Sequence, residues 1–328
     1  MRYILSLITG LVTLFGNVLG GYWVWGNAIL ILVIFVLLDW SFRPNKKSND
    51  SASPAVPNLV LILHVLLHTL AILTLLHGVH THHFEGLILI GALLSSGLNA
   101  GISGIVVAHE LIHRRSKAMR FLGVWNLLGV HYTHFYIEHI FNHHKNVGTS
   151  LDPATARKGE SLYAFIGRTI PAQFMSALKI AGSKKKSKTN IVIFFWIIQL
   201  VLDIAIFYFL GGFVLFVFIL QSIIAVLLLE YVNYIEHYGL SRPDAKKVDL
   251  THSWQSNTLT SRITLLELSR HSDHHLRAHK PYHLLVSHEE SPEMPGGYFG
   301  VFYICLIPSL WFKMIDPLLL KLQEVGGE

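Results

Sequence analysis

The sequence is poor in cysteine and in charge, and each shortage excludes a class of protein. Cys305 is the single cysteine among 328 residues, so the chain alone cannot form an internal disulfide, a four-cysteine zinc site or a rubredoxin-type iron centre. Charged residues make up 14%, whereas soluble domains average about 25%. With 52% of residues hydrophobic, the composition excludes an ordinary cytosolic protein, a coiled coil and a disordered chain.

Long apolar runs take the place of the missing charge. A helix needs about 20 apolar residues to cross a hydrocarbon core about 30 Å thick. We therefore predict an all-α, polytopic membrane protein in which 1–328 forms a single integral-membrane domain, with segments 109–190 and 235–328 as a helical cap on one side. The six predicted spans are 3–19, 22–40, 57–77, 86–108, 191–210 and 213–234.

The basic residues are distributed on one side of these spans. Loops 20–21, 78–85 and 211–212 contain no Lys or Arg, and all 26 basic residues fall in the other segments or at their edges. By the positive-inside rule, we expect both termini and the cap to be cytoplasmic, in a bacterial inner membrane. The same distribution indicates that the net charge of +6 serves contact with membrane lipid and not with nucleic acid.

Two segments of the cap are predicted to lie at the membrane surface. The run 184–188 is rich in lysine, and we interpret it as a topology anchor on anionic lipid, with docking of an acidic partner as the alternative. The apolar segment 298–314 is interrupted by Pro308 and Lys313, so we predict an interfacial helix and not a seventh span.

Histidine is abundant, with 21 residues, and four histidine motifs fall on the cytoplasmic side. In a helix, residues at i, i+3 and i+4 share a face. We therefore expect the imidazoles of His109 and His113 to point toward one common position, and likewise those of His139 and His143 and those of the last motif. His144 lies off that face and suits a second, nearby metal. The motifs are HELIH (109–113), EHIFNHH (138–144), NYIEH (233–237) and HSDHH (271–275).

Nine imidazoles exceed the needs of one tetrahedral zinc and suit two metals with four or five ligands each. Imidazole binds Zn, Cu, Fe and Ni, so the ligand type does not name the metal. The predicted ligands are His109, His113, His139, His143, His144, His237, His271, His274 and His275. A carboxylate in each motif is expected to accept the outer ring N–H of a ligand and to offset metal charge; these are Glu110, Glu138, Glu236 and Asp273.

Other polar residues in and between the spans are interpreted differently. His64 and His68, inside the third span, are predicted to make interhelical hydrogen bonds, and the histidines of 77–83 to form a solvated outer loop. His131 and His134 lie near the second motif and are candidates to support the ligands. Asp203, inside the fifth span, is a functional hypothesis without an assigned role.

At these motifs the chain resembles the integral-membrane alkane 1-monooxygenases, within the membrane fatty-acid desaturase/hydroxylase superfamily. The likeness runs from about residue 100 to the end, and NYIEHYGL together with RHSDHH distinguishes this family from ordinary desaturases. The matching stretches are HELIHRRS (109–116), residues 134–165, NYIEHYGL (233–240), LSRHSDHH (268–275) and residues 292–317.

The resemblance implies six spans and two non-haem iron ions held by the same nine histidines. It implies O2-dependent terminal hydroxylation of medium- and long-chain n-alkanes to 1-alkanols. No flavin, nicotinamide or four-cysteine motif is present, and the family implies rubredoxin and rubredoxin reductase as electron donors. The sequence of this chain departs from the family pattern after His275 and in the basic segment 183–190. These departures affect the surfaces that would contact the substrate and the partner.

An alkyl substrate needs an apolar channel that reaches the metals. Counting back from His109 along the fourth span by 4, 7 and 11 residues gives Ile105, Ile102 and Leu98, on the ligand-bearing face and deeper in the membrane. We predict that they line this channel; packing against neighbouring helices is the alternative.

Three other functions stay open at this point. A related di-iron hydroxylase or desaturase would act on aryl-methyl or fatty-acyl substrates. An intramembrane zinc protease would use the HExxH pattern of His109 and His113, with Glu110 as base, but leaves six histidines unexplained. A metal transporter would place ionisable residues along several spans, whereas here they collect at one end.

Overall fold

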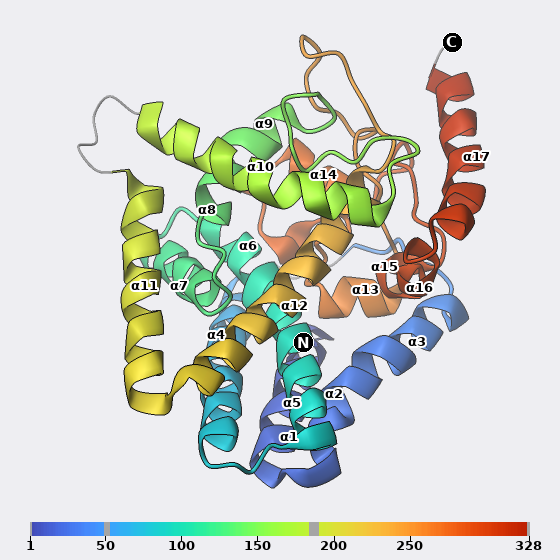
Figure 1. The fold of residues 1–328 in the computed structure, drawn as a ribbon. Helices are drawn as coiled ribbons and strands as arrows, with labels where there is room; N and C mark the ends of the chain where they lie inside the picture. Colours follow the sequence, from blue (N-terminus) through green and yellow to red (C-terminus); the bar gives the residue numbers. More distant parts are fainter. Residues whose placement is uncertain (1, 49–52, 184–189, 327–328) are drawn as a thin grey trace.

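The computed structural model describes residues 2–48, 53–183 and 190–326, and its regular elements within these residues are helices (Figure 1). Within that part of the chain, six helical segments are long and apolar enough to cross a membrane. They are Arg2–Leu19, Gly21–Ser41, Ala55–His80, Gly86–Ile112, Ile191–Leu210 and Gly212–His237. The six predicted spans are therefore confirmed. The fourth and sixth run further than predicted and carry histidine motifs at their ends.

Several spans are built from more than one helical segment. The first joins η1 (Arg2–Leu7) to α1 (Ile8–Leu19), and the second joins η2 (Gly21–Trp25), α2 (Gly26–Ile29), η3 (Leu30–Phe35) and α3 (Val36–Ser41). The third is α4 (Ala55–His80), and the fourth comprises α5 (Gly86–Asn99), η4 (Ala100–Val106) and α6 (Val107–Ile112). The fifth and sixth are α11 (Ile191–Leu210) and α12 (Gly212–His237).

Shorter elements and two long helices form the cap at one end of this bundle (Figure 1). Its first part contains α7 (Lys117–Leu128), α8 (Phe135–Glu138), η5 (His139–His143), α9 (His144–Asn146) and α10 (Leu162–Ser183). Its second part contains α13 (Leu259–Thr264), α14 (His271–Leu276), η6 (Tyr282–Leu284), α15 (Gly297–Gly300), α16 (Phe302–Cys305) and α17 (Pro308–Gly326).

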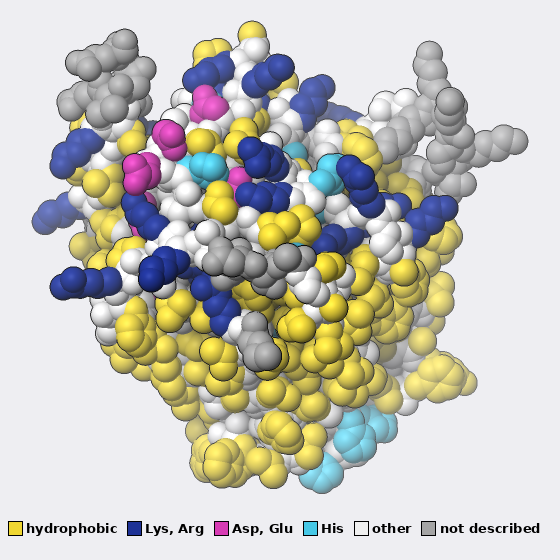
Figure 2. Space-filling model, turned by 180° about the vertical axis from the view of Figure 1, so that it is seen from behind, with side chains coloured by type: hydrophobic (Ala, Val, Ile, Leu, Met, Phe, Trp, Pro, Cys, Tyr) yellow, Lys and Arg dark blue, Asp and Glu magenta, His cyan; other side chains and the backbone are white. Residues whose placement is uncertain are grey.

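The surface is divided as a membrane protein requires. Figure 2 shows Lys and Arg gathered at the cap end, a broad hydrophobic surface below them, and histidines at the opposite end. The histidines of the outer loop, including His80, His82 and His83, are exposed, as predicted. The hydrophobic surface is where the bundle meets lipid, because large apolar side chains exposed in this number are not tolerated in water.

Polar contacts join helices inside the bundle. The ring of His64 lies 2.8 Å from Ser6 Oγ and 3.0 Å from Ser103 Oγ, so the predicted interhelical hydrogen bonding is confirmed for this residue. The ring of His131 lies 3.0 Å from Asp203 Oδ1 and 2.8 Å from Ser222 Oγ. Asp203 therefore ties the peripheral α11 to the bundle, a role that its sequence position did not reveal.

The C-terminal segment corrects one prediction. No single interfacial helix covers 298–314; α15 and α16 are short, and α17 begins at Pro308. Proline is accepted in the first turn of a helix, where its missing N–H has no partner to lose, so Pro308 starts α17 where we expected an interruption. The predicted lysine anchor at 184–188 lies outside the described residues.

Candidate metal centre

Four helical segments meet at the boundary between bundle and cap, and each contributes histidines. His109 lies in α6, and His113 follows its last residue. The second motif spans η5 and α9, His237 is the last residue of α12, and the final motif forms α14. All nine predicted ligand histidines come together here, although the first and the last of them, His109 and His275, are 166 positions apart in the chain.

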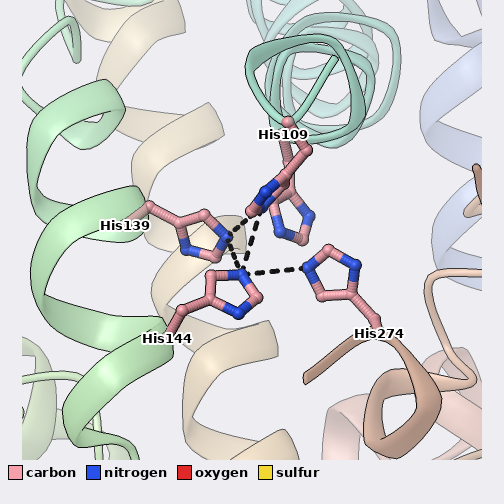
Figure 3. Close-up of side chains that lie close together, drawn as sticks. His109, His139, His144 and His274 are labelled. Carbon is pink, nitrogen blue, oxygen red and sulfur yellow. Dashed lines mark hydrogen bonds between the residues drawn. The ribbon is translucent and has the colours of Figure 1, made fainter. Parts of the chain in front are cut away.

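The histidines form two groups. In the first, five ring nitrogens lie within 4.8 Å of one another, from His109, His113, His139, His144 and His274. Figure 3 shows His139 and His144 facing His109 of α6 and His274 of α14. The Nε2 atom of His144 is 2.9 Å from that of His139, 3.1 Å from that of His113 and 3.2 Å from that of His274.

The second group contains four buried histidines, His143, His237, His271 and His275, again with ring nitrogens within 4.8 Å of one another. The Nε2 atom of His271 lies 3.2 Å from that of His237 and 2.9 Å from that of His275. The predicted nine ligands thus divide into five and four.

This division corrects the expected pairing within two motifs. Residues 139–143 form a π-helix, in which positions i and i+5 share a face, so His139 joins His144 while His143 turns to the second group. In α14, His271 and His275 at i, i+4 stay together, and His274 faces the first group. For residues 139–143, the spacing rule for an α-helix gave the wrong partners because the helix is locally wider.

The arrangement fits two metal ions. Ligand nitrogens about 2.1 Å from a metal lie about 3.0 Å apart across a right angle, which is close to the observed separations of 2.9–3.2 Å. The Nε2 atoms of His109 and His143 are buried without a hydrogen-bond partner among the described residues. Such buried polar atoms are costly unless a ligand satisfies them.

Burial also sets the charge state of the ligands. It lowers the pKa of His139, His144, His271 and His275 well below the usual value, and that of His274 to about 3. Neighbouring imidazoles add to the effect in each case, and for His274 the Asp273 carboxylate opposes it. A neutral imidazole keeps the lone pair that binds a metal.

A carboxylate that the sequence did not single out supports one of these ligands. His143 Nδ1 lies 3.0 Å from Asp152 Oδ2, and both side chains are buried. Burial alone would raise the pKa of Asp152, but the His143 ring and the Thr155 hydroxyl lower it overall. Likewise, His237 Nδ1 lies 3.3 Å from the carbonyl oxygen of His252. The only sequence signal for Asp152 was its position eight residues after His144.

The carboxylates predicted to accept ligand N–H groups have other partners. Glu110 pairs with Arg114 at 2.6 Å and accepts the Tyr282 N–H. Glu138 accepts from Asn142, and Asp273 pairs with Lys280. The expectation is therefore not met for these three, because each carboxylate is engaged by a cation or an amide and not by one of the nine imidazoles. Glu236 differs from them.

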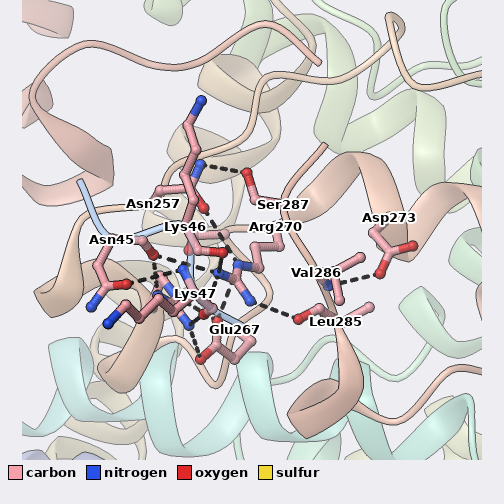
Figure 4. A network of polar contacts seen from close by, with 12 residues as sticks. Asn45, Lys46, Lys47, Asn257, Glu267, Arg270, Asp273, Leu285, Val286 and Ser287 are labelled. Atoms are coloured by element: carbon pink, nitrogen blue, oxygen red, sulfur yellow. Dashed lines mark hydrogen bonds and ion pairs between the residues drawn. The ribbon is translucent and has the colours of Figure 1, made fainter. Parts of the chain in front are cut away.

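The final motif is held by a buried ionic network (Figure 4). Arg270, directly before His271, donates to the carbonyl oxygens of Lys46, Lys47 and Leu285, at 3.1, 3.0 and 2.8 Å. Glu267 pairs with Arg262 at 2.7 Å. These contacts fix the start of α14 against the segment after the second span, and so orient its histidines.

An apolar cavity adjoins both groups. Its lining includes His109, His139 and His271 together with Ile102 and Ile105. A second apolar cavity is lined by Leu98 and shares Leu32, Leu228, Tyr231 and Phe302 with the first. The three residues predicted to line a channel therefore all face cavity space, with Leu98 in the outer cavity. His134 belongs to neither metal group and packs its ring against Tyr132 and Phe174.

Known proteins share these features. Residues 85–304 match the family model described as fatty acid desaturase. The chain is 34% identical to alkane 1-monooxygenase 1 of Pseudomonas aeruginosa, over 90% of this chain and 83% of the relative. It is 35% identical to alkane 1-monooxygenase 2 of Alcanivorax borkumensis, over 90% of this chain and 82% of the relative.

A third relative, the xylene/toluene monooxygenase hydroxylase component of Pseudomonas putida, is 30% identical over 96% of this chain and 87% of its own length. The matched region contains all four histidine motifs, and the relatives align along nearly the whole chain. On this evidence the chain belongs to the fatty acid desaturase family, on the branch that contains the alkane 1-monooxygenases.

Proposed function

We propose that this protein is an O2-dependent monooxygenase that hydroxylates the terminal carbon of medium- and long-chain n-alkanes to 1-alkanols. The observation that carries this proposal is a two-part histidine cluster facing an apolar cavity within a membrane bundle. The alkane 1-monooxygenases to which the chain is similar support the same activity.

The proposed cofactor is a pair of non-haem iron ions. Five histidines would hold one ion and four the other, in the groups described above. Iron bound there would supply the O2 activation and oxidising power that breaking an alkane C–H bond requires. The buried, neutral imidazoles and the Asp152–His143 pair suit a divalent cation.

The protein itself would position the substrate and exclude water. Ile102 and Ile105 flank the inner cavity beside His109, so an alkyl chain lying against them would present one end to the metals. The outer cavity beyond Tyr231 and Phe302 would take the rest of a longer chain. Holding the reacting carbon at the metals in a dry, apolar cavity is the main contribution that such residues make to rate.

Electrons would come from separate proteins. With Cys305 as its one cysteine, buried in the cap, the chain has no thiolate set for an iron–sulfur centre of its own. We propose rubredoxin and rubredoxin reductase as donors, docking on the basic cap face, which would be cytoplasmic together with both termini in a bacterial inner membrane. The acidic surface expected of such a donor would complement this face.

One alternative substrate class has specific support. The similarity to a xylene/toluene monooxygenase component favours aryl-methyl groups as a second candidate, and a fatty-acyl chain would fit the same apolar lining. The zinc protease alternative has lost support, because the Glu110 carboxylate is engaged by Arg114 and by the Tyr282 N–H and is not free to act as a base. A transporter would leave the closed, nine-histidine cluster unexplained.

A combined metal and product assay tests the proposal. The purified protein would be loaded with ferrous iron, supplied with NADH, rubredoxin and reductase, and offered octane, hexadecane, xylene and a fatty acid in separate reactions. We expect two irons per chain and 1-alkanol as the dominant product. Active protein that contains one zinc per chain and no iron would contradict the proposal, and a benzylic alcohol as the dominant product would favour the alternative.

A further inference from the structure

Glu236 occupies a position unlike that of the other carboxylates near the histidines. It precedes His237 at the end of α12, is buried, and lines the inner apolar cavity beside His109, His139 and His271. It is the one acidic residue among the described residues that line this cavity. A carboxylate in so apolar a cavity requires a partner, because an unpaired buried charge is expensive.

The partner of Glu236 is the ring of His271, one of the proposed metal ligands. Glu236 Oε2 lies 3.2 Å from Nε2 of His271, the same nitrogen that lies 3.2 Å from His237 Nε2 and 2.9 Å from His275 Nε2. One imidazole nitrogen carries at most one proton, so it cannot donate to all three atoms. Three donor atoms around one Nε2 are instead the arrangement expected when they surround a common ion.

The other contact of the Glu236 carboxylate is the Tyr298 hydroxyl, which donates its proton to the carbonyl oxygen of Trp254 at 2.8 Å. In contrast, Glu110, Glu138 and Asp273 contact Arg114, Asn142 and Lys280. Asp273 also contacts His288, which belongs to neither metal group.

We propose that the Glu236 carboxylate is a ligand of the second metal, the fifth after His143, His237, His271 and His275. The two metals would then have five protein ligands each. Imidazole ligands bring no negative charge to two divalent ions, and the Asp152 carboxylate lies behind His143 and not at an ion. Glu236 would supply an anion at the ions themselves. Imidazole combined with carboxylate is a donor set that suits iron. This inference rests on the proposed function, since it takes both groups as metal sites.

The variants Glu236→Gln and Glu236→Asp test the role of the carboxylate. Gln keeps the shape and removes the anion, whereas Asp keeps the anion but draws it back by one methylene. The matched control is Glu230→Gln, on the same helix and equally buried, whose carboxylate accepts from Tyr132, Gln173 and Asn233 at 2.9, 2.9 and 3.2 Å. Each full-length protein would be purified in detergent and loaded anaerobically with 57Fe2+.

The measurements are iron per chain, the affinity of each iron, and the Mössbauer spectrum. We expect Glu236→Gln to weaken one iron at least tenfold and to change the quadrupole splitting of that iron alone, with Glu236→Asp changing the same component, while Glu230→Gln matches the wild type. Two irons with wild-type spectra and affinities in Glu236→Gln would overturn the inference. If Glu236→Gln does not fold, Glu236→Asp decides by the same criterion.

Failure of this inference is distinguishable from failure of the proposed function. A wild-type protein that takes up fewer than two irons contradicts the di-iron centre and, with it, the assignment of Glu236. A wild type with two irons, together with unaltered Glu236 variants, contradicts only the assignment of Glu236.

Discussion

His143 and Asp152 form a buried pair in which the Nδ1 of the ring lies 3.0 Å from the carboxylate Oδ2. The Asp152 carboxylate is itself held by the Thr155 hydroxyl at 2.6 Å and by the N–H of Ala154 at 3.1 Å. With its Nδ1–H committed to this carboxylate, His143 must present the Nε2 lone pair to the second group of histidines. Asp152 therefore fixes both the tautomer and the ring orientation of a proposed ligand.

The first prediction concerns this pair. We expect Asp152→Asn to lower the affinity of one of the two irons by about 10–100-fold, the range typical of lost partners behind a metal ligand. The amide keeps the size of the carboxylate but removes its charge. Iron titration of the purified variant checks this, with the exposed Asp244→Asn as control. Equal iron affinities in the two variants would show that the pair does not support a ligand.

The second prediction concerns the division of the histidines. We expect His274→Ala to remove the iron of the five-histidine group and His143→Ala that of the four-histidine group, each leaving about one iron per chain. Both variants, and His113→Ala, should abolish turnover. His80→Ala and His83→Ala, in the outer loop, should retain both irons and full activity. Iron analysis and the Mössbauer spectrum of each variant check this. Loss of the same Mössbauer component in His274→Ala and His143→Ala would contradict the division into two groups.

Periodicity and composition predicted much of this molecule, because length and hydropathy are local properties. The six spans followed from apolar runs alone, and the nine clustered histidines followed from their spacing and from the family resemblance. What sequence could not show was the local widening of the helix at 139–143, since nothing in HIFNH differs from an α-helical pattern. This widening reassigned His143 and His139 to different groups.

Contacts between distant segments could not be predicted from the sequence either. Asp152 reaches His143 through a loop, and Asp203 meets His131 across 72 residues, so neither pairing leaves a periodic trace. The carboxylates of the motifs were assigned by proximity in sequence, whereas their partners are set by the groups that pack against them in the fold. Of these four carboxylates, Glu236 has an oxygen beside one of the nine clustered imidazoles, because it lies in the last turn of α12 next to the cavity.

The third prediction concerns electron delivery. Because the chain carries one buried cysteine, NADH and O2 alone should yield no product, and adding rubredoxin with its reductase should restore turnover. If the basic cap face steers an acidic donor, raising ionic strength should weaken the apparent affinity for rubredoxin, since exposed charges are screened over about 8 Å at 0.15 M salt. Initial rates across a salt series measure this. Turnover with NADH and no added protein would refute the requirement.

The fourth prediction concerns substrate length. The inner cavity contains Ile102 beside the histidines, and Leu98 lines the outer cavity one helical turn further from them. A chain held by its terminal carbon must extend past both residues. Since each buried methylene contributes about 0.8 kcal/mol, the space available at these positions should set the preferred length.

We therefore expect Leu98→Ala and Ile102→Ala to shift the preference toward longer alkanes by about two or three carbons, the room freed by truncating the side chain. Ile102→Trp should favour shorter alkanes or block them. Product profiles over a C6–C16 series, measured at equal iron content, check this against Ile90→Ala, a lipid-exposed position on the same span. If all three cavity variants keep the wild-type profile, the alkyl chain lies against another helix, and Leu32 and Leu228, which line both cavities, become the positions to vary.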